Sequence, residues 1–235
     1  MVLWGTIING ICIIIGTLIG KVFTRIPDNT KETVMKIIGL AVFLLGIQMG
    51  FKSNEFLIVI ISLVVGAVIG EWINLDRILN NIGFWLEKKL GSNHGSVSKG
   101  FVTATLIFVI GAMAVVGSLD SGLRGDHQVL FTKSIIDGFT SIVLTTTLGI
   151  GVMFSAIPVM LYQGSIALFA TQIDLFVPAD LLELLIAEIT ATGGVMIMAI
   201  GINMTGISTI RVANLLPGIL VAACLVVIQY FLLFD

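Results

Sequence analysis

The feature that most constrains this chain is a succession of long apolar runs that contain almost no charge. A helix needs about 20 apolar residues to cross the roughly 30 Å hydrocarbon core of a bilayer. Runs of about this size lie at 2–23, 34–51, 55–73, 100–118, 134–156, 158–173, 181–206 and 214–234. Only 11% of the residues are charged and 57% are apolar, too few polar groups to cover a soluble globule. The sequence therefore predicts an all-α, polytopic transmembrane helix bundle with eight spans.

Two segments bear on the number of crossings and on contact with the membrane surface. The run at 158–173 is short, so a seven-span bundle in which it does not cross stays open as an alternative. Residues 75–90, LDRILNNIGFWLEKKL, repeat apolar side chains at helical spacing and carry charges on the other face. This pattern predicts an amphipathic helix that lies in the interface, with the lipid bilayer as its partner.

Orientation is predicted from lysine and arginine, which concentrate in the cytoplasmic loops of membrane proteins. With eight spans, nine basic residues fall on one side: Lys21, Arg25, Lys31, Lys36, Arg77, Lys88, Lys89, Lys99 and Arg211. Lys52, Arg124 and Lys133 fall on the other side. We therefore expect both termini outside the cytoplasm. With seven spans the split weakens to eight against four.

Short matches between distant runs indicate an internal repeat. The matching segments are IING at 7–10 with IIDG at 135–138, VFTRIP at 22–27 with MFSAIP at 153–158, and 39–50 with 194–206. The last pair carries glycines seven residues apart in both copies, Gly39 and Gly46 in one and Gly194 and Gly201 in the other. Chance similarity between apolar sequences is the alternative explanation.

The repeat divides one integral membrane domain, 1–235, into repeat A (1–73), a connecting segment (74–130) and repeat B (131–235). With eight spans, the first matched pair of runs would be parallel and the other two pairs would be inverted. With seven spans, all three pairs would be parallel.

Polar side chains inside the apolar runs are the candidate binding residues, because hydrocarbon tolerates them only when they are paired or hydrated. The repeat matches Asn9 with Asp137 and Gln48 with Asn203. Transporters with internal repeats often bind substrate where the repeats meet near the midplane. These residues are therefore candidates for binding a small solute or ion, and hydrogen bonds that merely join helices are the alternative.

A second carboxylate, Glu188, lies inside the run at 181–206. Thr192 follows four residues later and shares its helix face. A carboxylate within a span suits the binding of a proton or a cation. A position at the interface beside Glu183 is the alternative.

The polar segment 117–133 contains Asp120, Arg124 and Asp126, which form either a charged vestibule or a solvated loop. The segment lacks the ligand spacing of a metal site. The chain also lacks enzyme signatures such as HExxH, GxSxG and Walker A, and it has no basic stripe for nucleic-acid phosphates. We therefore expect no catalysis, no cofactor, no metal ion and no nucleic-acid partner.

Pairs of glycines four residues apart predict close helix contacts, either within the chain or between two copies of it. The pairs are Gly16 with Gly20, Gly46 with Gly50, and Gly66 with Gly70. Because all three lie in the first three apolar runs, we expect a homo-oligomer, most simply a dimer.

Four longer motifs make the chain similar to a known family. They are GAMAVVGSLDSGLRGD at 111–126, KSIIDGF at 133–139, LGIGVMFSAIPVMLYQGS at 148–165 and RVANLLPG at 211–218. These motifs resemble the YdfK/YqgA family, number 554 among the domains of unknown function. The resemblance implies a small multi-pass protein of the bacterial inner membrane and implies no particular substrate.

Two functions fit these features. The first is a secondary transporter or permease for a small solute or ion, with its site at the candidate residues above. The second is an oligomeric membrane scaffold or sensor that transports nothing. Matched polar positions favour the first, and the glycine-rich faces fit either.

Overall fold

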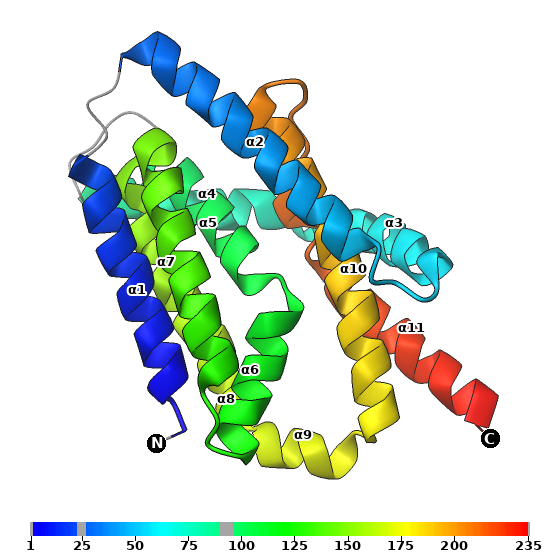
Figure 1. Cartoon of the computed structure of the whole chain (residues 1–235). Coiled ribbons are helices and arrows are strands. Elements are labelled where there is room, and N and C mark those ends of the chain that lie inside the picture. Colours follow the sequence, from blue (N-terminus) through cyan, green and yellow to red (C-terminus); the bar gives the residue numbers. More distant parts are fainter. Residues whose placement is uncertain (1, 23–26, 90–95, 235) are drawn as a thin grey trace. The chain divides into compact units, whose positions relative to one another are not determined.

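The computed structural model describes residues 2–22, 27–89 and 96–234, and every regular element among them is a helix (Figure 1). The helices of the first half are α1 (Trp4–Val22), α2 (Asp28–Gly50), α3 (Phe56–Ile73), α4 (Leu75–Lys89), α5 (Ser96–Val109) and α6 (Ala112–Leu123). Those of the second half are α7 (Gln128–Leu148), η1 (Gly149–Ser155), α8 (Ala156–Leu168), α9 (Ala170–Phe176), α10 (Ala179–Thr205), η2 (Val212–Leu215) and α11 (Pro217–Phe234).

The predicted all-α, multi-span class is confirmed. Among the described residues, six helical stretches are long and apolar enough to cross a membrane, and one of them is the 41-residue stretch Gln128–Leu168. The bent pair of α5 and α6, with an angle of 63° between its helices, is a seventh candidate. Gly111, at the bend, has a φ of +147°, which is a backbone conformation that glycine adopts readily.

The chain divides into two compact units, and each unit combines helices from both halves of the sequence. The first contains α1, α5, α7, η1 and α8, most of α4 and α6, and the adjoining parts of α2 and α9. The second contains α3, α10 and α11 together with most of α2. The candidate site is built in the first unit.

Helix α1 turns its small and polar residues inward and its large apolar residues outward. The buried face consists of Gly5, Thr6, Asn9, Gly10, Ile13, Gly16, Thr17 and Gly20. On the opposite face Ile7, Ile11, Ile15 and Leu18 are 41–50% exposed. Lipid tails solvate isoleucine and leucine as well as a protein core does, so small residues are used for close helix packing instead.

In the first unit, α1 packs against α7 in the same direction. Gly5 contacts Leu130 near the start of α7, and Gly20 contacts Ile142 farther along it. Between them, Gly16 lies directly against the Gly138 carbonyl group, so a side chain at Gly16 would collide with backbone. This close parallel contact brings the polar residues of α1 to those of α7.

Helix α8 packs against α1 in the opposite direction, so the chain folds back between α7 and α8. Gly10 contacts Met160, whereas Gly164, farther along α8, lies next to Thr6. The reversal falls in η1, a 3₁₀ segment that contains Gly149 and Gly151. The stretch Gln128–Leu168 is therefore a helical hairpin rather than one straight helix.

In the second unit, α2 and α10 cross at four glycines. A Cβ atom on Gly39 would lie 2.8 Å from the Gly201 carbonyl oxygen, and one on Gly46 would lie 2.6 Å from the Gly194 carbonyl oxygen. Gly39 thus meets Gly201, near the end of α10. Gly46 lies later in α2 and meets Gly194, which lies earlier in α10. The two helices therefore run in opposite directions.

Helices α3 and α11 pack in the same antiparallel manner. Gly66 lies directly against the backbone of Gly218, and Gly70 lies directly against that of Asn214. On the outer surface of α3, Leu57, Val64 and Val68 are 59–68% exposed, which suits contact with lipid.

The glycine pairs noted in the sequence therefore pack mostly within the chain. Gly16, Gly20, Gly46, Gly66 and Gly70 all face backbone or side chains of α7, α10, η2 or α11, whereas a Cβ atom on Gly50 would have no described neighbour within 4 Å. A homodimer would have to use another surface, and its formation stays a prediction.

Helix α4 exposes an apolar stripe made of Ile78, Ile82 and Trp85, while Gly83 is buried against Ser98. The ammonium group of Lys89 lies 4.3 Å from the centre of the Trp85 ring. Residue 90, the last of the predicted amphipathic segment, lies outside the described residues.

Candidate functional site

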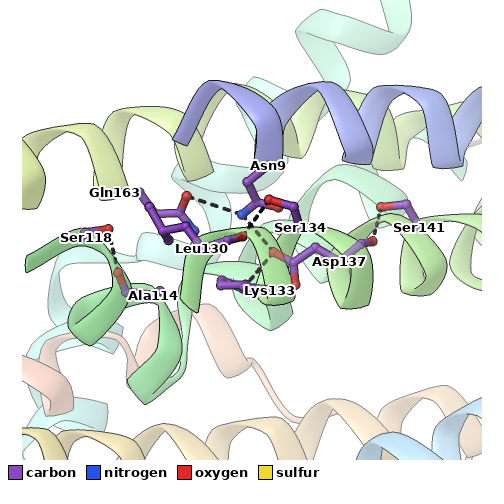
Figure 2. A network of polar contacts seen from close by, with 9 residues as sticks. All are labelled: Asn9, Ala114, Ser118, Leu130, Lys133, Ser134, Asp137, Ser141 and Gln163. Carbon is purple, nitrogen blue, oxygen red and sulfur yellow. Dashed lines mark hydrogen bonds and ion pairs between the residues drawn. The ribbon is translucent and has the colours of Figure 1, made fainter. Parts of the chain in front are cut away.

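A polar network lies where α1 meets α7 and α8 (Figure 2). Its members are Asn9 on α1, Lys133 and Asp137 on α7, and Gln163 on α8. All four are buried, with relative exposures between 0% and 7%. We call these residues the α1–α7–α8 network.

Its centre is an ion pair between residues one helical turn apart. The Lys133 ammonium donates to Asp137 Oδ2 at 2.7 Å, and the Asn9 amide donates to the same oxygen at 3.0 Å. The Asn9 amide also donates to Gln163 Oε1 at 3.3 Å. A single asparagine therefore joins the ion pair to α8.

Hydroxyl groups extend this polar surface along both helices. On α7, Ser134, Ser141 and Thr145 are fully or almost fully buried, and each donates to the carbonyl group four residues earlier at 2.6–2.7 Å. On α1, Thr6 and Thr17 are buried one turn before and two turns after Asn9. Each α7 hydroxyl oxygen can still accept a hydrogen bond.

Burying two charges is costly, because the desolvation of both ions offsets much of their attraction. Apolar residues of similar volume would often give equal or higher stability. Ionisable residues within membrane helices commonly mark the pathway of an ion or a substrate. The Lys133–Asp137 pair is therefore the strongest indication of function in the described part of the chain.

Two members of the network are missed by the sequence analysis. Lys133 lies just before the apolar run at 134–156 and falls among the predicted loop residues, although its spacing of four residues from Asp137 is that of a helical ion pair. Gln163 lies in the short sixth run, where the internal repeat offers no matching position. The sequence signal that could have identified Gln163 is its uncharged polar side chain inside an apolar run.

Glu188 has a different setting, in the second unit. Its carboxylate accepts hydrogen bonds from Ser53 Oγ at 2.7 Å and from the backbone N–H groups of Asn54 and Glu55 at 2.8 and 3.1 Å. These groups immediately precede α3. Glu188 thus caps the start of α3 from a neighbouring helix, which satisfies free N–H groups and complements the helix dipole.

The other candidates of that unit do not gather around Glu188. Thr192 is fully buried on α10. Gln48 is exposed on α2. The Asn203 side chain bonds both backbone groups of Ile210 at 2.7 Å and so closes the loop after α10. Of the two pairs matched by the repeat, only Asn9 and Asp137 are in direct contact.

The proposed vestibule residues lie around the turn between α6 and α7. Arg124 forms an exposed ion pair with Asp120 at 3.4 Å. Asp126 Oδ1 accepts a hydrogen bond from the Gln128 backbone at 2.9 Å and so caps the start of α7. These contacts order the turn that precedes Lys133.

Comparison with known proteins gives relatives that share nearly the whole chain. The sequence is 35% identical over 224 residues to the uncharacterized membrane protein YdfK of Bacillus subtilis, covering 93% of each chain. It is 27% identical over 225 residues to the uncharacterized protein YqgA of Escherichia coli, covering 93% of this chain and 94% of that protein. No solved structure matches the chain significantly. The model for "Protein of unknown function (DUF554)" matches residues 4–227, so the chain belongs to this family of membrane proteins.

Proposed function

We propose that this protein is a secondary transporter or permease that moves a small solute or ion across the bacterial cytoplasmic membrane. The observation that carries the proposal is the Lys133–Asp137 ion pair, buried among helices of membrane-spanning character and held by Asn9 and Gln163. A pair of this kind costs stability, and a binding step that uses its charges explains why it is present. The proposal assigns no catalytic reaction to the chain.

Helix directions within each unit support a proposal for the number of crossings. Consecutive spans cross in opposite directions, so α1 and α3 cross one way and α2 crosses the other. Helix α7 is parallel to α1, and α10 is antiparallel to α2, so α7 and α10 both cross in the direction of α1. The chain must therefore return once through the α5–α6 pair and once through α8. With α11, these directions support the interpretation of eight spans.

The weakest of these spans is α8. Its 13 residues reach about 20 Å at 1.5 Å per residue, which is less than the hydrocarbon thickness. The adjoining η1 and α9 add length at both ends. A short helix can span the membrane where the surrounding protein or a locally thinner bilayer accommodates it.

The same helix directions support the internal repeat. In the matched pairs, α1 and α7 are parallel, whereas α2 with α10 and α3 with α11 are antiparallel. An eight-span arrangement of repeats A and B requires the same combination of one parallel pair and two antiparallel pairs. In each pair, moreover, a helix packs directly against its counterpart in the other repeat.

With eight spans, the basic residues place both termini outside, and α4 rests on the cytoplasmic leaflet. The exposed stripe of Ile78, Ile82 and Trp85 would then enter the headgroup region, while Lys88 and Lys89 contact anionic lipid.

A scaffold or sensor is the second candidate, favoured by one observation. The hydroxyl groups of Ser134, Ser141 and Thr145 bond their own helix and are satisfied without a substrate. In this alternative the network only holds α1, α7 and α8 in register, and the protein acts as a homo-oligomer.

Thiol labelling separates the two candidates, because a transport cycle must admit water to the network. In a chain from which Cys12 and Cys224 have been removed, Ser141→Cys should react with a small charged methanethiosulfonate. Phe139→Cys, on the lipid-facing surface of α7 with Phe139 68% exposed, should not react. Only a hydrated thiol ionises to the reactive thiolate.

The positive control is Thr171→Cys, an exposed position on α9. If Ser141→Cys is as inert as Phe139→Cys while Thr171→Cys reacts, water does not reach the network and the scaffold becomes the better account.

A further inference from the structure

Three buried polar atoms around the α1–α7–α8 network have no hydrogen-bond partner among the described residues. They are Thr6 Oγ1, Asn9 Oδ1 and Gln163 Nε2. Their residues are at most 2% exposed. Leaving a buried donor or acceptor without a partner destabilises the folded protein. Such atoms therefore indicate a small polar ligand between α1 and α8.

The chemistry of Asp137 decides which amide atoms are left over. An ionised carboxylate only accepts hydrogen bonds, so Asn9 must turn its NH₂ group toward Asp137. The second hydrogen of that group goes to Gln163 Oε1. Asn9 Oδ1 then remains as an unused acceptor and Gln163 Nε2 as an unused donor. Their orientation is thus a consequence of the charge on Asp137.

Gly164 follows Gln163 on α8 and lies close to Thr6 of α1. It is buried, yet a Cβ atom built on it would lie 3.6 Å from Leu3 Cδ2 and 3.9 Å from Thr6 Cγ2, which are ordinary contacts. By contrast, a Cβ atom on Gly10, also in the contact between α1 and α8, would collide with the Met160 side chain. A methyl group at Gly164 would therefore be accommodated in ordinary contact with Leu3 and with the Thr6 methyl group.

We propose that water bound by Thr6, Asn9 and Gln163 delivers protons to Asp137, so that the proton is the transported or coupling ion. This proposal rests on the proposed transport function. Water can both donate to Asn9 Oδ1 and accept from Gln163 Nε2, and buried waters typically make about three hydrogen bonds to groups of this kind. A proton arriving as hydronium breaks one O–H bond and forms another on the Asp137 carboxylate.

Protonation of Asp137 would change which groups donate and which accept hydrogen bonds in the network, with no further residue needed. The neutral carboxyl group can donate to Asn9 Oδ1, so the Asn9 amide is free to reverse and Gln163 can follow it. The ion pair with Lys133 is lost in the same step. Lys133 on α7 and Cys12 on α1 are the titratable groups that face Asp137 from the packed helices, and α8 contributes the neutral Gln163.

The test is a rapid pH jump on proteoliposomes of Escherichia coli polar lipids adsorbed to a solid-supported membrane. The wild type should give a transient current as protons bind, and Asp137→Asn should abolish it. Thr6→Val, which removes the hydroxyl while keeping the shape of the side chain, should slow the current by about tenfold because the buried bridging water loses one of its partners. Gly50→Ala, at a glycine with open space in the second unit, is the matched control and should behave as wild type.

Thr6→Val breaks no hydrogen bond within the described chain, so a slower current reports on the water and not on lost protein contacts. Gly164→Ala is a second control on α8, since its methyl group would make ordinary contacts with carbon atoms of Leu3 and Thr6, and it should behave as wild type. The proposal is overturned if the wild type gives no more current than protein-free vesicles, or if Thr6→Val matches Gly50→Ala. If the wild type dissipates another gradient but shows no pH-jump current, transport stands and the proton is excluded. If it does neither, both proposals fail.

Discussion

Lys133→Met should destabilise the protein by about 3–5 kcal/mol, the usual cost of leaving one member of a buried ion pair without its partner. Asp137 would then retain the Asn9 amide at 3.0 Å but no cation within the network. We expect a markedly lower unfolding temperature of the purified protein in detergent.

The double variant Lys133→Met/Asp137→Asn should recover most of the lost stability, because no uncompensated charge remains and the introduced amide can still accept a hydrogen bond from Asn9. A matched surface control exists on α2, where Lys36 and Glu32 form an ion pair with the same spacing and the same 2.7 Å distance but are 54% and 68% exposed. Lys36→Met should leave the unfolding temperature unchanged within error. Equal effects of Lys133→Met and Lys36→Met would show that the buried pair is not the electrostatic centre of the first unit.

Gly201→Ala should also destabilise the protein, by about 1–3 kcal/mol or more, because the crossing of α2 and α10 leaves no room for a methyl group. The new Cβ atom would lie 2.6 Å from the Gly39 carbonyl oxygen and 2.6 Å from the Phe43 backbone nitrogen. Backbone atoms on both helices cannot move aside as a flexible side chain can. We expect a lower unfolding temperature and more aggregated protein on size-exclusion chromatography.

Gly50→Ala should raise the stability of the protein instead of lowering it, and so serves as the control. It adds the same methyl group to open space at the end of α2, where alanine's higher helix propensity gains up to about 1 kcal/mol. If Gly201→Ala is as stable as Gly50→Ala, the close crossing of α2 and α10 is wrong, and with it the support for inverted repeats.

The sequence was most informative where hydropathy and the predicted internal repeat were used together. Long apolar runs predicted helices at nearly all the observed positions, because a bilayer allows few other structures. The repeat match of IING with IIDG identified Asn9 and Asp137, which are hydrogen-bonded. Helix direction supplied what hydropathy could not, since the length of 158–173 left its crossing open and only the packing of Gly10 and Gly164 shows that the chain reverses.

The sequence was least informative where a residue's role depends on a distant partner. Glu188 looks like an ionisable group within a span, and only the fold shows that its carboxylate meets the N–H groups before α3. Asn203 resembles a midplane binding residue, yet it bonds the backbone of Ile210. Hydropathy places the helix start after Lys133 and so predicts a loop there, whereas α7 begins at Gln128. Local composition does not encode these tertiary contacts.

The central claim, that the α1–α7–α8 network moves a solute or ion, is tested most directly by gradient dissipation in proteoliposomes. Purified protein is reconstituted at equal density as wild type, Asp137→Asn and Ser165→Ala, the last being an exposed position on α8. Gradients of proton, sodium, potassium, chloride and glycerol are then imposed in turn. The account predicts that at least one gradient collapses faster with the wild type than in protein-free vesicles, that Asp137→Asn removes the difference, and that Ser165→Ala keeps it. Gradients that decay alike in wild-type, Asp137→Asn and protein-free vesicles would contradict the account.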